Sequence, residues 1–591
     1  MTPFIQPIRS YGLVLLLAII VASCANLLPR QARENQFSDL EGYYVAGPLA
    51  VTEVVAVEGF VAVRPPQWGG RPYFAPSIDN RFVMTLPHTD TDRWVEFSRD
   101  LDGSGTSLRF NELHSSFDGI EFIRLQDGDH TPAQFFFDRH PELAAQTALR
   151  NPQITVEQLY EFTAQQFIRY PSRRDDSIRF MEILRDQYPD HVGFTALLGL
   201  ALVSVGDRVG ALEHSQAALQ AEPDNDLARE TIRRLTMVDP APGEGYRAVL
   251  PFRLSAAHAR PTASEIRNVR NIWPTRNLEP AFVNIESEYT TEISGIEYRI
   301  QIIRHELNGE THYGAAFIPA FSRGLLPVII DARGVNPDYS PMNIDDGTQL
   351  MRAMGDAENH YIFLVPAMNG HTLEAGGVDY VSTGDPSDAW DGATDATIGF
   401  LNAALSTISN ADQQKIAAFG HSRGSTVALL AGIRDPRISL VLSVSGPVDH
   451  FQAMNSYLGW TSAELLADSM SDGLPPTLEE EGGQDFDHFF DRVLTDGETL
   501  AEVRLRLLAS SPLYFADNLP ETHVFFGADD RSVPVENARL LREAMENNGL
   551  MEAGSTLRLY PDLGHDTDSL HSWRDSRNYL EAWADMTPSE H

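Results

Sequence analysis

The pattern of hydrophobic and polar positions divides the chain into three regions. Between residues 37 and 130, apolar and polar residues alternate with a period of two in Arg93–Asp100 and Thr106–Asn111, and Val51–Val63, with Gly59, reads as a hairpin. This alternation predicts a small antiparallel β-domain. From residue 150 to residue 238 the pattern is helical, and from residue 246 onward short continuous apolar runs alternate with helical stretches. The last pattern predicts a doubly wound, mostly parallel α/β sheet, because strands buried on both faces lose the alternation.

Small residues in the helical region lie at the offsets of tetratricopeptide repeats. Gly199, Gly206 and Ala211 occupy such positions, and Pro189 precedes Pro223 by one 34-residue period. Residues 150–238 therefore resemble TPR-like helices, in which small residues let paired helices pack closely. The resemblance implies a possible role in binding a protein partner, and the alternative is an ordinary helical spacer.

Residues 1–23 have the form of a secretory signal peptide. Arg9 precedes the apolar run Tyr11–Ala22, which is short for a membrane span and fits a signal sequence. The run leads into Val21-Ala-Ser-Cys24, which resembles a bacterial lipoprotein box. That resemblance implies cleavage before Cys24, lipidation of this cysteine, a polar tether over residues 24–36, and a place in the bacterial cell envelope. Ala25 then favours the outer membrane, and the alternative is a plain secretory signal with an incidental cysteine.

Composition limits the classes of function. A chain of 591 residues is too long for one hydrophobic core, so several domains are expected. The net charge of −38 argues against nucleic acid as a partner. Lys415 is the only lysine, which disfavours Schiff-base chemistry, and the single cysteine excludes disulfides within the chain.

The segment Ile416–Gly432 carries the strongest chemical signal. It runs from an apolar stretch through Gly420-His-Ser-Arg-Gly424 into a second apolar stretch that reads as a buried helix. Strand, tight turn and helix are the context in which G-x-S-x-G forms a nucleophile elbow, with Ser422 as the nucleophile. The two glycines suit a close approach of strand and helix, and the N–H of Arg423 would point at a developing oxyanion.

Two later strand ends supply a candidate acid and base. The strand Thr522–Phe526 leads to Asp529 and Asp530, of which Asp530 has the better register and Asp529 is expected to be a turn residue. The strand Ser555–Tyr560 leads to His565. The order Ser422, Asp530, His565 is the serine, acid, histidine order of the α/β-hydrolases. Asp449, just after another strand, is the alternative acid.

Residues 285–591 resemble an α/β-hydrolase of the prolyl oligopeptidase and dienelactone hydrolase-like group. The matching segments include Tyr313–Pro319, Pro327–Gly334, Phe363–Gly370, GHSRG, GADDRSVP and LGH. The loop after the third strand departs from the usual pattern and reads Asp331-Ala-Arg-Gly-Val335. The second oxyanion donor is therefore the N–H of Gly334, the N–H of Val335 or the side chain of Arg333.

The resemblance implies a serine hydrolase with its catalytic domain at residues 246–591 and a cap insertion at about 447–513. The expected reaction is hydrolysis of an ester or peptide-like bond in a small-molecule or peptide substrate, with no metal and no other cofactor. The alternative from another class is a lipid-anchored TPR interaction protein with an inactive hydrolase fold.

Overall fold

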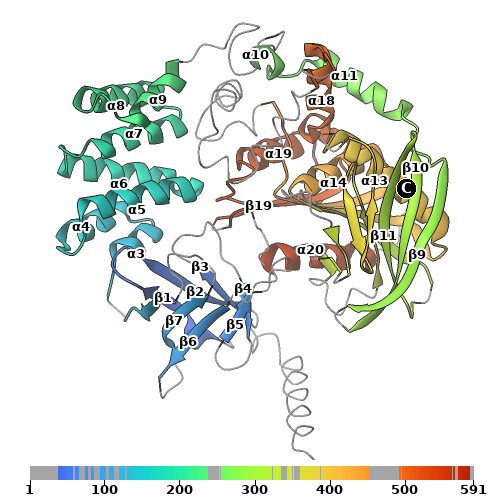
Figure 1. The fold of residues 1–591 in the computed structure, drawn as a ribbon, viewed down its shortest axis with the longest axis horizontal. Coiled ribbons are helices and arrows are strands. Elements are labelled where there is room, and N and C mark those ends of the chain that lie inside the picture. Colours follow the sequence, from blue (N-terminus) through green and yellow to red (C-terminus); the bar gives the residue numbers. More distant parts are fainter. Residues whose placement is uncertain are drawn as a thin grey trace, which may run out of the picture. The chain divides into compact units, whose positions relative to one another are not determined.

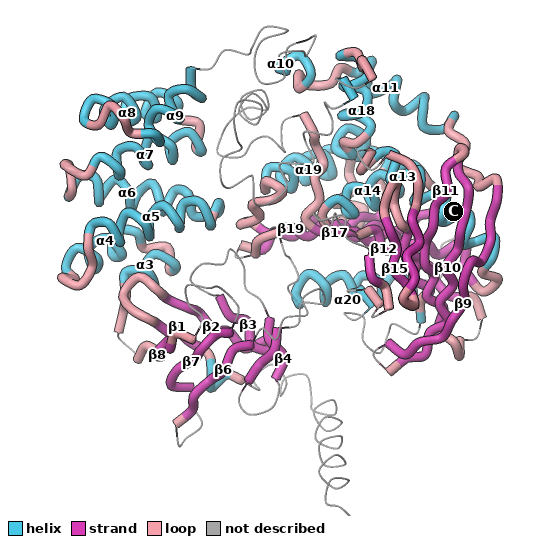
Figure 2. The backbone as a smooth tube through the Cα atoms, in the orientation of Figure 1, coloured by secondary structure: helices cyan, strands magenta, loops and turns pink. Residues whose placement is uncertain are grey.

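The computed structural model describes residues 37–585 with internal gaps, of which the longest are 65–72, 85–93, 237–251, 334–341, 352–359 and 452–491. The chain forms two compact units, Met1–Ile154 and Thr155–His591. Strands and helices occupy separate stretches of sequence at first and alternate in the C-terminal region (Figure 2). The signal peptide, Cys24 and the tether lie outside the described residues.

The first unit contains the expected β-domain as a closed barrel of antiparallel neighbours, in which β1 pairs with both β2 and β8 (Figure 1). Alternation places Tyr44, Phe97 and Phe110 in its core, where all three are buried. The strands are β1 (Gly42–Val45), β2 (Val51–Val57), β3 (Phe60–Arg64), β4 (Tyr73–Pro76), β5 (Arg81–Met84), β6 (Trp94–Arg99), β7 (Gly105–Asn111) and β8 (Glu121–Arg124).

Two helices that the sequence analysis did not predict follow the barrel, α3 (Pro132–Phe137) and α4 (Pro141–Arg150). Thr131 caps α3 by accepting a hydrogen bond from the backbone N–H of Gln134. The hydroxyl of Tyr43 in β1 donates to Asp138 at 2.7 Å, which ties the end of α3 to the barrel.

The second unit begins with five successive helices over the region expected to be helical. In α7 a Cβ built on Gly199 would lie 2.4 Å from Ser215 Oγ and 3.2 Å from the Ala211 carbonyl of α8. A small residue is thus required where α7 and α8 touch. The helices are α5 (Val156–Arg169), α6 (Arg174–Gln187), α7 (Val192–Ser204), α8 (Arg208–Ala221) and α9 (Asp226–Thr236).

The C-terminal region contains a nine-stranded sheet in the order β20-β19-β18-β17-β12-β14-β11-β10-β9. Six neighbouring strands, from β20 to β14, are parallel, and β11, β10 and β9 continue the sheet with antiparallel pairing. The strands are β9 (Phe282–Ile293), β10 (Ile296–Leu307), β11 (Glu310–Pro319), β12 (Leu326–Ala332), β14 (Ile362–Pro366), β17 (Ala411–His421), β18 (Ile438–Val444), β19 (Glu521–Gly527) and β20 (Thr556–Tyr560). A separate small sheet contains β13 (Met342–Asn343), β15 (Thr372–Ala375) and β16 (Val378–Val381).

One expectation for this sheet was wrong. The sequence of Tyr289–Ile302 predicts a single strand, but the segment contains the end of β9, a turn and the start of β10. Gly295 lies in this turn with φ +87°, a left-handed conformation that glycine adopts without strain. The glycine was the available signal, but the apolar and β-branched residues on both sides hid it.

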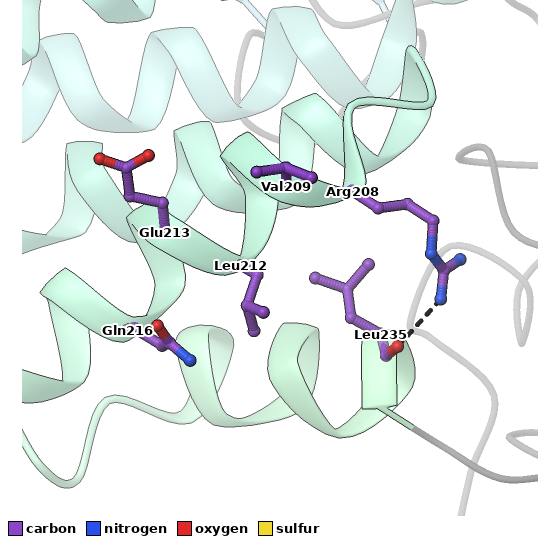
Figure 3. A pocket seen from close by; sticks show the side chains of 6 residues that line it. All are labelled: Arg208, Val209, Leu212, Glu213, Gln216 and Leu235. Atoms are coloured by element: carbon purple, nitrogen blue, oxygen red, sulfur yellow. Dashed lines mark hydrogen bonds between the residues drawn. The ribbon is translucent and has the colours of Figure 1, made fainter.

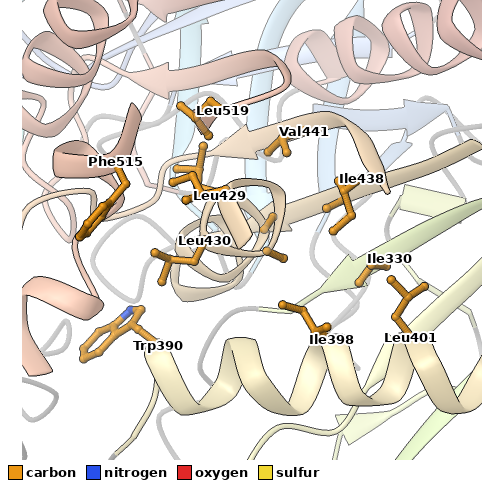
Figure 4. Close-up of a cluster of buried hydrophobic side chains, with 14 of the residues drawn as sticks. Ile330, Trp390, Ile398, Leu401, Leu429, Leu430, Ile438, Val441, Phe515 and Leu519 are labelled. Atoms are coloured by element: carbon orange, nitrogen blue, oxygen red, sulfur yellow. The ribbon is translucent and has the colours of Figure 1, made fainter. Parts of the chain in front are cut away.

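Residues of the central strands alternate between two cores. Ile330 of β12 faces the first core, whereas Ile329 faces the second, which also contains Leu580 of α20 (Leu570–Asp585). In Figure 4 the first core joins α13 (Asp391–Thr407), α14 (Arg423–Arg434) and β18 through side chains such as Leu401, Leu430 and Val441. Each fully buried leucine stabilises the fold by about 2 kcal/mol. The same core takes in α11 (Ala263–Ile272), α18 (Leu500–Ala509), η7 (Pro512–Asn518) and α19 (Glu536–Asn547).

The predicted cap insertion is only partly described. Its later part contains α18, whose Val503 and Leu507 are fully buried in the first core, so this helix belongs to the body of the domain. Residues 452–491, on which the prediction of a cap mainly depends, lie outside the described residues. Among the helices that the structure describes, none has the length and apolar character needed to cross a membrane.

Candidate active site

Ser422 lies on a sharp turn between β17 and α14. Its backbone has φ +56° and ψ −127°, a left-handed conformation that is strained for a residue with a side chain. The strand runs toward the carboxyl edge of the sheet and the helix returns from it, so the turn presents Ser422 at that edge. This is the geometry of a nucleophile elbow.

The two glycines of the motif are required by contact. A Cβ built on Gly420 would lie 2.0 Å from the carbonyl oxygen of Gly424, and one on Gly424 would lie 2.0 Å from the carbonyl oxygen of Ala332. Both obstacles are backbone atoms, which cannot move aside as a side chain can. The elbow therefore accepts only hydrogen at these two positions.

A chain of hydrogen bonds joins the three residues that the sequence analysis singled out. His565 Nε2 lies 2.9 Å from Ser422 Oγ, and His565 Nδ1 lies 2.9 Å from Asp530 Oδ2 and 3.1 Å from Oδ1. The ionised carboxylate can only accept, so Nδ1 carries the proton and Nε2 accepts from the serine hydroxyl. This tautomer is the one that a general base needs.

The carboxylate of Asp530 is fixed by its own turn. Its Oδ1 accepts hydrogen bonds from the backbone N–H groups of Ser532 and Val533, at 3.0 and 2.7 Å, and the residue is 1% exposed. Gly527, at the end of β19, permits the approach of the histidine segment, because a Cβ there would lie 2.3 Å from the carbonyl oxygens of Leu563 and Gly564.

The other two candidate carboxylates have different partners. Asp529 accepts a hydrogen bond from the backbone N–H of Ser172 at 3.0 Å. Asp449 accepts from the N–H of Phe451 at 2.9 Å and from the hydroxyl of Tyr514 at 3.0 Å. The structure therefore brings Asp530 to His565 and gives Asp449 and Asp529 other contacts.

The candidate oxyanion donors are described only in part. Arg423 is the first residue of α14, where backbone N–H groups lack partners within the helix. Gly334 and Val335 lie outside the described residues. The side chain of Arg333 points to the carbonyl oxygens of Asn343 and Gly347, each at 3.4 Å. These contacts favour a role in holding the backbone at Asn343 and Gly347 over a role as oxyanion donor.

Two histidines near the elbow escaped the sequence analysis. The guanidinium of Arg423 donates to His371 Nε2 at 3.0 Å, and burial together with this cation lowers the pKa of His371 to about 4. His421 Nε2 lies 3.0 Å from the carbonyl oxygen of His565. His421 was visible inside the glycine-flanked motif, but nothing in the sequence showed which loop it would meet.

In the described part of the chain, no cluster of three or more His, Cys, Asp or Glu side chains could hold a metal ion. A cavity of about 440 Å³ opens on the helical region between α8 and α9, lined by Val209, Leu212, Leu235 and the polar side chains of Arg208, Glu213 and Gln216 (Figure 3). None of its lining residues belongs to the group around Ser422.

The strand order and the placement of Ser422, Asp530 and His565 at strand ends define the fold as that of an α/β-hydrolase. No protein-family model and no curated protein sequence matches the chain. Similar solved structures include the acetyl xylan esterase from Paenibacillus sp. R4, at 18% identity and TM-score 0.36, over 56% of this chain and 99% of that one.

Acetyl xylan esterase 1 from Thermoanaerobacterium sp. JW/SL YS485 is similar at 14% identity and TM-score 0.37, over 55% of this chain and 98% of that one. The acylaminoacyl peptidase of Pyrococcus horikoshii is similar at 13% identity and TM-score 0.34, over 50% of this chain. The chain spans 43% of that peptidase's length. Function is therefore inferred from the geometry of the site.

Proposed function

We propose that the protein is a serine hydrolase that cleaves an ester or peptide-like bond through an acyl-enzyme. The observation that carries the proposal is the continuous contact from Ser422 Oγ through His565 to Asp530, with hydrogen bonds of 2.9 Å on both sides of the imidazole. A hydroxyl, an imidazole and a carboxylate in this sequence activate a nucleophile without a cofactor.

Each residue has a defined part in the proposed reaction. His565 removes the proton from Ser422 as the oxygen attacks the carbonyl carbon of the substrate. Asp530 keeps the Nδ1 proton in place and stabilises the imidazolium that forms. The N–H of Arg423 and one from the loop after β12 stabilise the oxyanion. The imidazolium then donates its proton to the leaving group, and water attacks the acyl-enzyme with the same base.

A fluorophosphonate probe tests this proposal on the purified protein. Such a probe reacts with a serine only where the hydroxyl is activated. We expect labelling of the wild type, none of Ser422→Ala, and undiminished labelling of Ser406→Ala, which removes a helix hydroxyl bonded to the Ala403 carbonyl. A folded wild type that does not react would support the alternative, an interaction protein with an inactive hydrolase fold.

We propose in addition that the mature protein is anchored by lipid at Cys24 in the bacterial cell envelope, in the outer membrane. The proposal is supported by the apolar run that ends in Val21-Ala-Ser-Cys24, which resembles a lipoprotein box. Labelled palmitate should enter the wild type and not Cys24→Ser. Incorporation that persists in the variant would contradict the anchor.

The five helices α5–α9 are proposed to be TPR-like and to offer a surface to a protein partner. Support comes from the close contact of α7 and α8 at Gly199 and from Pro189 and Pro223, which follow α6 and α8.

The substrate is proposed to be a small molecule or a peptide. Rates on acyl esters compared with those on amino-acyl amides would separate esterase from peptidase.

A further inference from the structure

His421, the residue before the proposed nucleophile, contacts the backbone of the proposed base. Its Nε2 lies 3.0 Å from the carbonyl oxygen of His565, and the two imidazole rings lie 5.1 Å apart between centroids. A carbonyl oxygen only accepts, so His421 Nε2 carries the proton and donates it.

This contact adds a second hydrogen bond between the elbow and His565, beside the one from Ser422 to the imidazole. His565 belongs to a segment after β20 that is neither helix nor strand. Asp530 fixes the ring through Nδ1, and the backbone N–H of Asp529 donates to the carbonyl oxygen of Leu563 at 2.9 Å, two residues before His565. The bond from His421 adds a direct contact between the backbone of His565 and the last residue of β17, one residue from Ser422.

The distance from His565 Nε2 to Ser422 Oγ therefore depends on contacts to the ring of His565 and on contacts to its backbone. A shift of the histidine segment away from the elbow would lengthen this 2.9 Å hydrogen bond, and a displacement of about 1 Å can cost about 100-fold in rate. The chain thus uses the same short turn to present its nucleophile and to hold its base.

We infer that His421 is a positioning residue that acts through the backbone of His565; this inference rests on the proposed function. It holds the general base within reach of the serine hydroxyl and takes no proton from the substrate. The residue type matters because a donor must reach the carbonyl from the strand end. The amide nitrogen of glutamine reaches about as far as Nε2, whereas leucine has the bulk without the donor.

The test uses purified full-length protein and a chromogenic ester. We expect His421→Leu to lower kcat about 10- to 100-fold with KM changed less than about twofold, and His421→Gln to restore most of the loss. The same pair should change the rate of fluorophosphonate labelling in the same way. Thermal unfolding of each variant reports whether the fold is intact.

A double-mutant cycle separates positioning from general damage. If His421 acts through His565, then His421→Leu should have little further effect on the residual rate of His565→Ala. An equal loss in both backgrounds, or His421→Leu within twofold of an active wild type, overturns this inference and leaves the hydrolase proposal standing. An inert wild type overturns both.

Discussion

Arg504 of α18 and Glu265 of α11 form a two-pronged ion pair. Arg504 Nε lies 2.7 Å from Glu265 Oε1 and Nη2 lies 3.0 Å from Oε2. The third nitrogen, Nη1, donates to the backbone carbonyls of Ala256, Ala257 and Ala259. One guanidinium therefore joins α18 to α11 and to the backbone of residues 256–259, which precede the sheet in sequence.

Arg504→Leu should lower the free energy of unfolding by about 2 kcal/mol, because it removes an ion pair whose arginine is nearly buried and whose glutamate is partly exposed, and it leaves three carbonyls with one donor fewer. The loss of unfolding free energy caused by Arg504→Leu should depend on pH. Arg504 lowers the pKa of Glu265 from 4.5 to about 2, with help from Thr262. The pair therefore stabilises fully above about pH 4.5, and this contribution is lost as the pH falls toward about 2.

Urea unfolding of wild type and Arg504→Leu across this range measures the effect. The difference in unfolding free energy should be constant at neutral pH and should narrow in acid. Arg299→Leu is a suitable control, since its ion pair with Glu288 is long, at 3.9 Å, and exposed. If wild type and Arg504→Leu differ in unfolding free energy by the same amount near pH 2 as at neutral pH, then packing and not charge makes Arg504 important.

Asp530→Asn should lower kcat about 10³- to 10⁴-fold with little change in KM. The asparagine amide keeps the shape of the carboxylate but cannot hold the Nδ1 proton in the same way or stabilise an imidazolium. Asp529→Asn is the matched control, because this neighbouring carboxylate accepts a hydrogen bond from the backbone N–H of Ser172, whereas Asp530 contacts His565. Equal losses in the two variants would refute the assignment of Asp530 as the acid.

The elbow could be predicted from sequence because its constraints are local. Gly420 and Gly424 lie within four residues of each other, and the backbone contacts that exclude a Cβ involve the turn itself and the adjacent strand β12. The candidate acid was harder to assign, since Asp449 and Asp530 both follow strands. Only the fold shows that one meets His565 and the other meets Tyr514.

Other features depended on contacts that no local pattern encodes. The split of Tyr289–Ile302 into two strands rests on a single short turn at Gly295 between residues that all favour strands. The contact of His421 joins positions far apart in sequence, and its partner is a backbone carbonyl, which every residue carries. Sequence alone therefore identified three residues that the structure brings together, but not the contacts that hold them in place.

Gly424→Ala should abolish activity and lower the free energy of unfolding by about 3 kcal/mol, because the new methyl group would overlap the backbone of Ala332. Gly432→Ala, in the same helix, is the control. Its Cβ would meet Cγ2 of the buried Val441 at 2.5 Å and the ring of Pro520 at 3.2 Å, so this variant crowds the core but leaves the elbow unchanged. We expect the control to lose up to about 2 kcal/mol of stability and to keep its activity. Loss of activity in both variants would contradict the close approach at the elbow.

His305→Leu should make the protein less sensitive to acid. His305 of β10 is fully buried beside His312 of β11, and burial, with a smaller effect of His312, lowers its pKa from 6.5 to about 3. The unfolded chain binds the proton more readily, so the neutral ring stabilises fully above about pH 6.5 and loses this contribution as the pH falls toward 3. Between about pH 7 and about pH 4.5 the variant should lose about 2 kcal/mol less than wild type in urea unfolding. The exposed His360 gives the control His360→Leu, which should follow wild type. An acid sensitivity unchanged in His305→Leu would show that the buried imidazole does not govern stability in this range.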